Sequence, residues 1–225
     1  MIQFFHVSMH YLKDLPALDD ITFSLEKGEF TFLTGASGAG KSTLLKLIYR
    51  AEYPTKGQIL IDSSNINLLP AKKLHTLRRK IGIVFQDFKL LRDRTVHENI
   101  AIPLRVIGEK NAHIEKKVNN ALSIVGLSHR KRYITAHISG GEQQRVAIAR
   151  AIVGNPKILL ADEPTGNLDT ELSMEIIKIF ERINQSGVTM IVATHDQFLL
   201  NLFSKRLIKL DKGRVILDRR PGGVS

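Results

Sequence analysis

The chain has 225 residues, of which 43% are apolar and 24% charged, so it can bury a sizeable core and we do not expect wholesale disorder. The absence of cysteine excludes disulfide frameworks and thiolate metal sites, and we expect neither a secretory signal nor an apolar stretch of the ~20 residues that cross a bilayer. The formal net charge of +11 favours either an anionic partner (nucleotide, nucleic acid or membrane surface) or a solvated basic surface.

The first sixty residues carry short strand patterns separated by turns. The predicted strands are Ile2–Val7, Ile21–Leu25 and Gln58–Ile61, and the Lys27–Gly28 pair marks one of the turns. This pattern predicts an antiparallel sheet beside the main sheet of the protein.

Apolar runs and helical patterns alternate in the rest of the chain. Strands that alternate with helices predict a mainly parallel sheet that is covered on both faces. In chain order the predicted elements are strand Phe30–Thr34, helix Lys41–Tyr49, strand Ile81–Phe85, strand Lys157–Ala161, helix Thr170–Ile183 and strand Val188–Ala193.

Residues 87–154 lie between two of these strands and are mostly helical in pattern, so we expect a helical lobe inserted into the core. Residues 1–86 and 155–225 would then form the core with its antiparallel subdomain, and residues 1–225 a single domain. Near the end, Arg206–Leu210 and Val215–Leu217 flank a turn sequence, which predicts a hairpin.

Residues 35–42, here called the phosphate loop, fit the pattern G-x-x-x-x-G-K-[ST] between a predicted strand and a predicted helix. Glycines let the backbone turn its N–H groups toward phosphate oxygens, and the helix N-terminus adds positive partial charge. Lys41 would meet the β- and γ-phosphates, and the Ser42 hydroxyl would bind Mg²⁺. The expected ATP-binding residues here are Gly35, Ala36, Ser37, Gly38, Ala39, Gly40, Lys41, Ser42 and Thr43.

A second apolar strand ends in two acids, Asp162 and Glu163. Asp162 stands where P-loop ATPases carry an aspartate that holds Mg²⁺, and Glu163 can aim at the water that attacks the γ-phosphate. Pro164 favours an extended backbone at Glu163. Without the phosphate loop, the same acids could simply end a strand at the solvent.

Residues 138–145, here called the signature segment, read Ile-Ser-Gly-Gly-Glu-Gln-Gln-Arg. Ser139 and Glu142 predict a capping box at a helix start. Together with the two preceding motifs, the segment resembles the L-S-G-G-Q signature of ABC ATPases, with departures at Ile138 and Glu142. The resemblance to this family covers essentially the whole chain. It implies an α/β fold: a P-loop NTPase core with a mainly parallel sheet, an N-terminal antiparallel β subdomain and an inserted α-helical subdomain.

In ABC ATPases two subunits pair head to tail, and each signature caps the ATP held by the other subunit. The resemblance therefore implies a homodimer that forms on ATP binding. The residues implied to contact ATP from the opposite subunit are Ser139, Gly140, Gly141 and Asp169, and Asp169 is also a good N-cap for the helix that follows it.

The resemblance assigns three further residues. Gln86 matches the glutamine that touches Mg²⁺ and the attacking water, and His195 matches the histidine that contacts the γ-phosphate. Tyr11 matches the aromatic residue that stacks on adenine, although a partly buried surface tyrosine would look the same. The implied catalytic residues are thus Glu163, His195, Gln86 and Lys41, and the implied Mg²⁺ ligands are Ser42, Gln86 and Asp162.

Five segments carry a closer resemblance within this family: residues 32–48, 85–87, 90–96, 99–104 and 158–169. They resemble the FtsE family of bacterial cell-division ATPases. This resemblance implies an integral membrane partner of the FtsX type, activation of cell-wall hydrolases, and a peripheral position on the cytoplasmic side of the inner membrane at the division site. Two alternatives remain: the ATPase subunit of a lipoprotein-releasing or other transporter, and a soluble ABC ATPase acting on nucleic acid.

Overall fold

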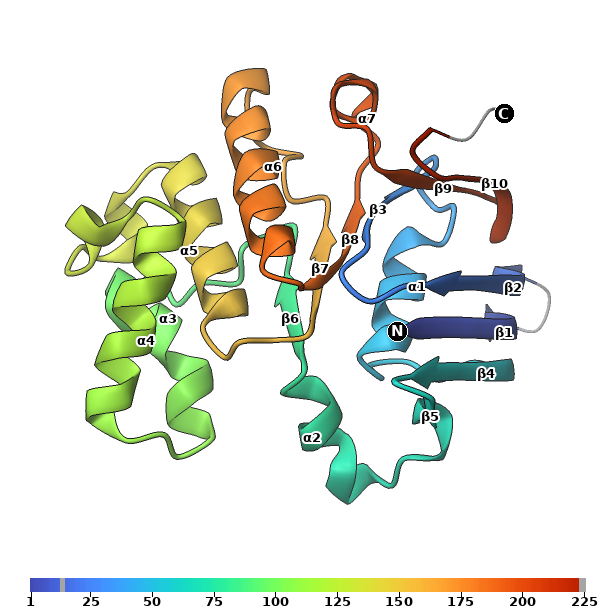
Figure 1. Cartoon of the computed structure of the whole chain (residues 1–225), viewed down its shortest axis with the longest axis horizontal. Coiled ribbons are helices and arrows are strands. Elements are labelled where there is room, and N and C mark those ends of the chain that lie inside the picture. Colours follow the sequence, from blue (N-terminus) through green and yellow to red (C-terminus); the bar gives the residue numbers. More distant parts are fainter. Residues whose placement is uncertain (13–14, 223–225) are drawn as a thin grey trace.

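The computed structural model describes residues 1–12 and 15–222, and it forms two β-sheets with helices around them (Figure 1). The smaller sheet has the strand order β2-β1-β4-β5, and its paired strands are antiparallel, as the sequence predicts. Its strands are β1 (Ile2–Leu12), β2 (Leu15–Leu25), β4 (Lys56–Ile61) and β5 (Ser64–Asn65).

The larger sheet has the strand order β10-β9-β3-β8-β7-β6. Strands β6, β7, β8, β3 and β9 are parallel, and β10 closes the edge through an antiparallel hairpin with β9. The predicted mainly parallel sheet and the predicted hairpin are therefore both confirmed. The strands are β3 (Phe30–Thr34), β6 (Ile81–Val84), β7 (Ile158–Asp162), β8 (Thr189–Ala193), β9 (Arg206–Asp211) and β10 (Arg214–Arg219).

Helices α3, α4 and α5 come between β6 and β7 in the chain and gather on one side of the larger sheet, whereas the smaller sheet lies on the other side (Figure 1). The α-helices are α1 (Lys41–Ile48), α2 (Leu74–Arg78), α3 (Val96–Val106), α4 (Asn111–Ile124), α5 (Gly140–Ile152), α6 (Thr170–Gln185) and α7 (Gln197–Leu202). Single 3₁₀ turns cover Ile66–Leu68, Ala71–Lys73, Ser128–Arg130 and Thr135–His137.

Strand β7 shows why the sequence reads as continuous apolar runs here. Ile158 and Leu160 pack into a core shared with α1 and the smaller sheet, whereas Leu159 and Ala161 pack into a core shared with α5 and α6. Successive strand residues point to opposite faces, and both faces of this sheet are covered, so the four residues before Asp162 are all apolar.

The short helices α2 and α7 were not anticipated from the sequence. They have five and six residues, which is too short to show a helical apolar repeat. Among the described residues, no helix is both long enough and apolar enough to span a membrane.

Candidate nucleotide-binding site

The phosphate loop connects β3 to α1, where the sequence places it. Gly40, the residue before α1, has φ +105°, and a Cβ there would lie 2.5 Å from the Ala17 carbonyl oxygen. Only glycine fits this close approach. Gly38 is also left-handed, at φ +78°, but nothing lies within 4 Å of a Cβ built on it. No side chain caps α1, so the first N–H groups of this helix remain available to an anion.

The Lys41 side chain is buried and curls back over the phosphate loop. Its Nζ donates to the carbonyl oxygens of Gly35 at 2.8 Å and Ala36 at 3.1 Å. The same Nζ lies 3.6 Å from Oε1 of Glu163. The ammonium group is thus held at the centre of the loop, between backbone carbonyls and a carboxylate.

Asp162 ends β7 beside Ser42. Its Oδ1 atom is buried and has no hydrogen-bond partner among the described residues. Burial raises the pKa of the Asp162 carboxyl above its ordinary value, and neighbouring Glu163 raises it further, whereas hydrogen bonding to Ser42 acts in the opposite direction. A buried oxygen without a partner is costly on its own and is suited to a cation.

Glu163 follows Asp162, and one oxygen of its carboxylate lies close to both Lys41 and His195. Its Oε1 is 3.3 Å from Nδ1 of His195, in addition to the contact with Lys41. The expectation of an extended backbone at Glu163 is wrong, because its φ is +45°. Its N–H donates to the Ala193 carbonyl at 3.0 Å, and this bond with the side-chain contacts outweighs the local preference set by Pro164.

Gln86 follows β6 and lines two adjacent cavities. One, of about 440 Å³, lies over the phosphate loop and is also lined by Tyr11 and Glu163. The other, of about 410 Å³, is also lined by Ser42 and Asp162. The exposed Tyr11 ring stands at the rim, with its hydroxyl 3.4 Å from that of Thr43.

The signature segment lies away from both of these cavities. Ser139 caps α5, and the predicted capping box is present: Ser139 Oγ accepts from Glu142 N–H at 3.2 Å, and Glu142 accepts from Ser139 N–H at 2.9 Å. In Figure 1, α5 and α1 lie on opposite sides of strands β6 to β8. Neither cavity that contains Gln86 is lined by Ser139, Gly140 or Gly141.

Asp169 begins α6 beside the signature segment. Its Oδ1 accepts from Leu172 N–H at 2.8 Å, so the predicted N-cap is confirmed. A Cβ on Gly141 would meet the Leu172 side chain at 3.2 Å, which shows how closely the starts of α5 and α6 pack. The four residues expected to act on the opposite subunit thus form a second group, apart from the phosphate loop.

Glu142, where the ABC signature usually has glutamine, is held by Arg130, whose Nε donates to Oε1 at 2.7 Å. Burial raises the pKa of the Glu142 carboxyl, but hydrogen bonds from Ser139 N–H and Arg130 outweigh it and leave the pKa below its ordinary value. The carboxylate therefore stays ionised and completes the cap.

Sequence reasoning missed Arg150, which fixes the loop after Gln86. From α5, its Nη1 donates to the Lys89 carbonyl and its Nη2 to the Phe88 carbonyl, each at 2.6 Å. Phe88 and Lys89 both have left-handed backbones, with φ +55° and +48°. Burial lowers the pKa of the Arg150 guanidinium. The sequence did contain a signal for this residue, because Arg150 is the single charged residue in the apolar stretch of residues 146–153.

Comparison with known proteins places this arrangement in a family. The family model described as ABC transporter matches residues 18–166, which is more than half of the chain. The chain therefore belongs to this family and is an ATP-hydrolysing cassette.

Two similar proteins indicate a narrower group within this family. The chain is 47% identical over 222 residues to the cell division ATP-binding protein FtsE of Bacillus subtilis, covering 99% of the chain and 97% of that relative. It is 49% identical over 215 residues to FtsE of Escherichia coli K12, covering 96% and 97%.

Two solved structures share the fold. One is a dimeric post-hydrolysis state of the ATP-binding cassette MJ0796 bound to ADP and Pi, with TM-score 0.89, 33% identity and full coverage of both chains. The other is cbiO1 of Clostridium perfringens, part of the ABC transporter complex cbiONQ, with TM-score 0.91, 34% identity, and coverage of 98% of this chain and 88% of that one.

Proposed function

We propose that this chain is the ATP-binding and ATP-hydrolysing subunit of a membrane complex in bacterial cell division. In this proposal two copies close around ATP, and an integral membrane protein of the FtsX type receives the resulting movement. The separation of the expected site residues into two groups on different parts of the molecule carries the two-copy arrangement. The identity with FtsE proteins over nearly the whole chain supports the role in cell division.

The separation supports a composite site. A phosphate held at Lys41 cannot be capped by Ser139 of the same chain, because α5 starts on the other side of strands β6 to β8 (Figure 1). A second copy in head-to-tail orientation would bring its own Ser139 to that phosphate. One similar structure is a dimer bound to ADP and Pi, which favours the same arrangement here.

The chemistry asks for positioning and charge stabilisation more than covalent catalysis. Lys41 and the uncapped N–H groups of α1 would hold the phosphates. Glu163, with Oε1 close to both Lys41 and His195, would orient and polarise the attacking water. Hydrolysis removes the charge that bridges the two copies, so the dimer opens.

The residues present fit a Mg²⁺ ion. The unpartnered buried oxygen of Asp162 and the Ser42 hydroxyl are hard oxygen ligands, and Gln86 lines the same cavity. Mg²⁺ is usually held by one or two carboxylates together with substrate phosphates. When bound, the ion would neutralise charge on the β- and γ-phosphates.

A groove next to Gln86 is suited to the membrane partner. It has a volume of about 460 Å³ and runs between the end of α3 and the loop after β6. Its walls include Leu104, the exposed Ile107 and Arg79. Phe85 and Lys89 line both this groove and the cavity that contains Asp162. A segment that docks in the groove would thus contact the loop that carries Gln86.

Contact with anionic lipid is partly supported by four basic clusters in the sequence: Lys72–Lys73, Arg78–Arg79–Lys80, Arg130–Lys131–Arg132 and Arg219–Arg220. Several of their members are paired with carboxylates, including Arg130 with Glu142 and Lys131 with Glu115. Lys72, Lys73 and Arg79 have no carboxylate oxygen within 4.0 Å among the described residues. Lys72 and Lys73 lie just before α2, whereas Arg79 follows α2 and lines the groove, so we propose that the lipid contact lies around this helix.

The dimer is tested with two substitutions. We expect Glu163→Gln to lower turnover by about 100-fold or more and to trap an ATP-bound dimer, seen by size exclusion with light scattering in saturating ATP and Mg²⁺. Adding Ser139→Arg should return the protein to a monomer, whereas Ser123→Arg, at the exposed end of α4, should not. A monomeric Glu163→Gln protein would contradict the composite site.

The cellular role is tested by a fluorescent fusion in dividing cells of the source bacterium. A band at midcell that disappears with its FtsX-type partner supports the proposal. Even labelling of the membrane would favour a transporter subunit, and labelling of the nucleoid would favour action on nucleic acid.

A further inference from the structure

A large cavity lies on the edge of the main sheet opposite the nucleotide site. Its volume is about 960 Å³. Lys27 lies just before β3, Lys157 just before β7 and Val188 just before β8, so the cavity opens at the amino ends of parallel strands. The phosphate loop and Asp162 lie at the carboxyl ends of the same strands. No residue assigned above to ATP, Mg²⁺ or the opposite subunit lines this cavity.

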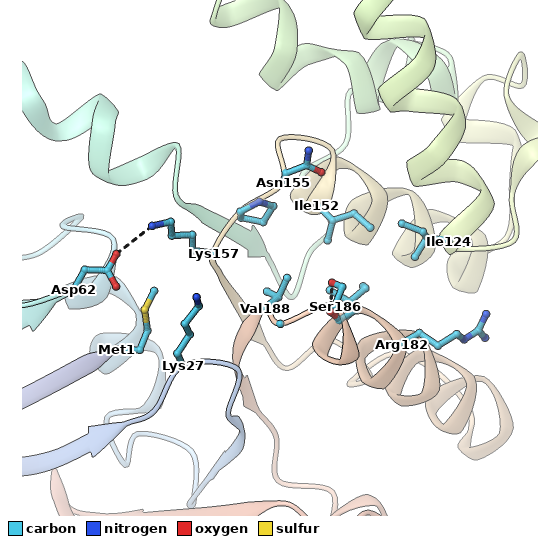
Figure 2. A pocket seen from close by; sticks show the side chains of 13 residues that line it. Met1, Lys27, Asp62, Ile124, Ile152, Asn155, Lys157, Arg182, Ser186 and Val188 are labelled. Carbon is cyan, nitrogen blue, oxygen red and sulfur yellow. Dashed lines mark hydrogen bonds and ion pairs between the residues drawn. The ribbon is translucent and has the colours of Figure 1, made fainter.

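Most of the charged side chains gather at one end of the cavity, with Met1 among them, whereas the isoleucine and valine side chains and Arg182 lie toward the other end (Figure 2). The side chains of Lys27, Lys157 and Asp62 lie on one side, with Lys157 Nζ 3.5 Å from Asp62 Oδ2. Ile152, Ile124 and Val188 lie toward the other. Ile152 is buried, whereas Ile124 is 41% exposed, which is high for a large apolar side chain.

The charges at this edge favour an anion at one end only. Among the described residues, neither Lys27 nor Arg182 has a carboxylate oxygen within 4.0 Å. Helices α4, α5 and α6 all end beside the apolar part, and helix C-termini carry partial negative charge, which Arg182 in the last turn of α6 partly offsets. An anionic group is therefore disfavoured near the isoleucines and favoured between Lys27 and Lys157.

We propose that this cavity binds a single-chain amphiphilic anion, with its carboxylate between Lys27 and Lys157 and its hydrocarbon chain over Ile124, Ile152 and Val188. The volume lies in the range of small-molecule sites, which are mostly apolar with a few placed polar groups. The charge pattern selects an anionic head group, and the apolar end selects a chain rather than a free inorganic anion.

The test uses octanoate as the probe and isothermal titration calorimetry on the full chain. We expect a dissociation constant of about 0.1–1 mM for octanoate, at least fivefold weaker binding of octanol and of octylammonium, and no measurable binding of acetate. Methyl NMR signals of Ile124 and Ile152 should shift on titration. Equal affinity for octanoate and octylammonium, or shifts confined to other isoleucines, would overturn the proposal.

The matched variants separate charge at the cavity from overall charge. Lys27→Glu with Lys157→Glu should weaken octanoate binding about tenfold or more, whereas Lys110→Glu with Lys116→Glu, on α4 and its start, should leave it within twofold. Both double variants should keep basal ATP hydrolysis, since neither pair lies at the nucleotide site. Loss of the exposed Lys157–Asp62 ion pair should lower the melting temperature of the first variant only slightly, so that it stays folded in the assay. Unchanged octanoate affinity in the first variant would exclude the site even if ATP hydrolysis follows the scheme above.

Discussion

Arg150 provides the sharpest test of how this site is held together. It reaches from α5 to two consecutive carbonyls in the loop after Gln86, and it touches no group expected to bind nucleotide. We expect Arg150→Leu to lower kcat strongly while leaving the affinity for ATP nearly unchanged. The substitution removes both hydrogen bonds without removing a proposed catalytic group.

The size of the effect follows from the loop geometry. Hydrogen bonds that involve a charged group contribute about 1.5–3 kcal/mol each, so the pair contributes about 3–6 kcal/mol. They oppose the left-handed backbones of Phe88 and Lys89, which cost about 1–2 kcal/mol each. Water replaces part of the lost bonding at this partly exposed loop. We therefore expect a net loss of about 2–3 kcal/mol, which is about a 30- to 150-fold fall in kcat.

The assay compares steady-state ATP hydrolysis with titration of a fluorescent ATP analogue. Arg150→Lys should recover part of kcat, because an ammonium group can still reach one carbonyl. Arg105→Leu, on the exposed face of α3, is the matched control and should keep full activity. In a double-mutant cycle with Gln86→Ala, the losses should be far from additive, since both changes act on one group. Additive losses, or a fall in ATP affinity equal to the fall in kcat, would refute the reasoning.

Three further predictions concern the phosphate loop and its neighbours. Lys41→Ala should weaken ATP binding by about 100-fold in the analogue titration, because it removes the buried cation of the loop; unchanged affinity would remove Lys41 from its role. Asp162→Asn should raise the melting temperature of the metal-free protein at pH 7 by about 2 °C or more. The pKa of the Asp162 carboxyl is raised in the folded state, so this group stabilises the fold at low pH and loses that contribution as the pH rises through the folded pKa. The gain should vanish below the ordinary carboxyl pKa, and a gain that is constant with pH would contradict it. Gly40→Ala should lower the free energy of unfolding by about 2–4 kcal/mol and the melting temperature by more than about 5 °C. Gly38→Ala, with open space around the new Cβ, should lower the free energy of unfolding by only about 1 kcal/mol. Equal losses of stability would argue against the steric explanation.

The local signals in the sequence predicted the local structure well. The strand Phe30–Thr34 has the predicted bounds, and the capping box of Ser139 with Glu142 is present as expected. Both depend on residues a few positions apart, so they are visible in the sequence alone. The backbone of Glu163 was wrongly predicted, because a hydrogen bond to Ala193, thirty positions along the chain, decides it.

The sequence by itself determined the class of this protein: the phosphate loop, the acids that end a strand and the signature segment are contiguous patterns whose residue types predict what they bind. Only the tertiary structure decided which of them meet. It brings Lys41, Glu163 and His195 together because β3, β7 and β8 are neighbouring parallel strands that end at one edge. It keeps Ser139 away from them because the helical insertion places α5 on the other side of the sheet. It also shows the role of Arg150, because hydrogen bonds from a helix to carbonyls far away in the sequence produce no periodic sequence pattern.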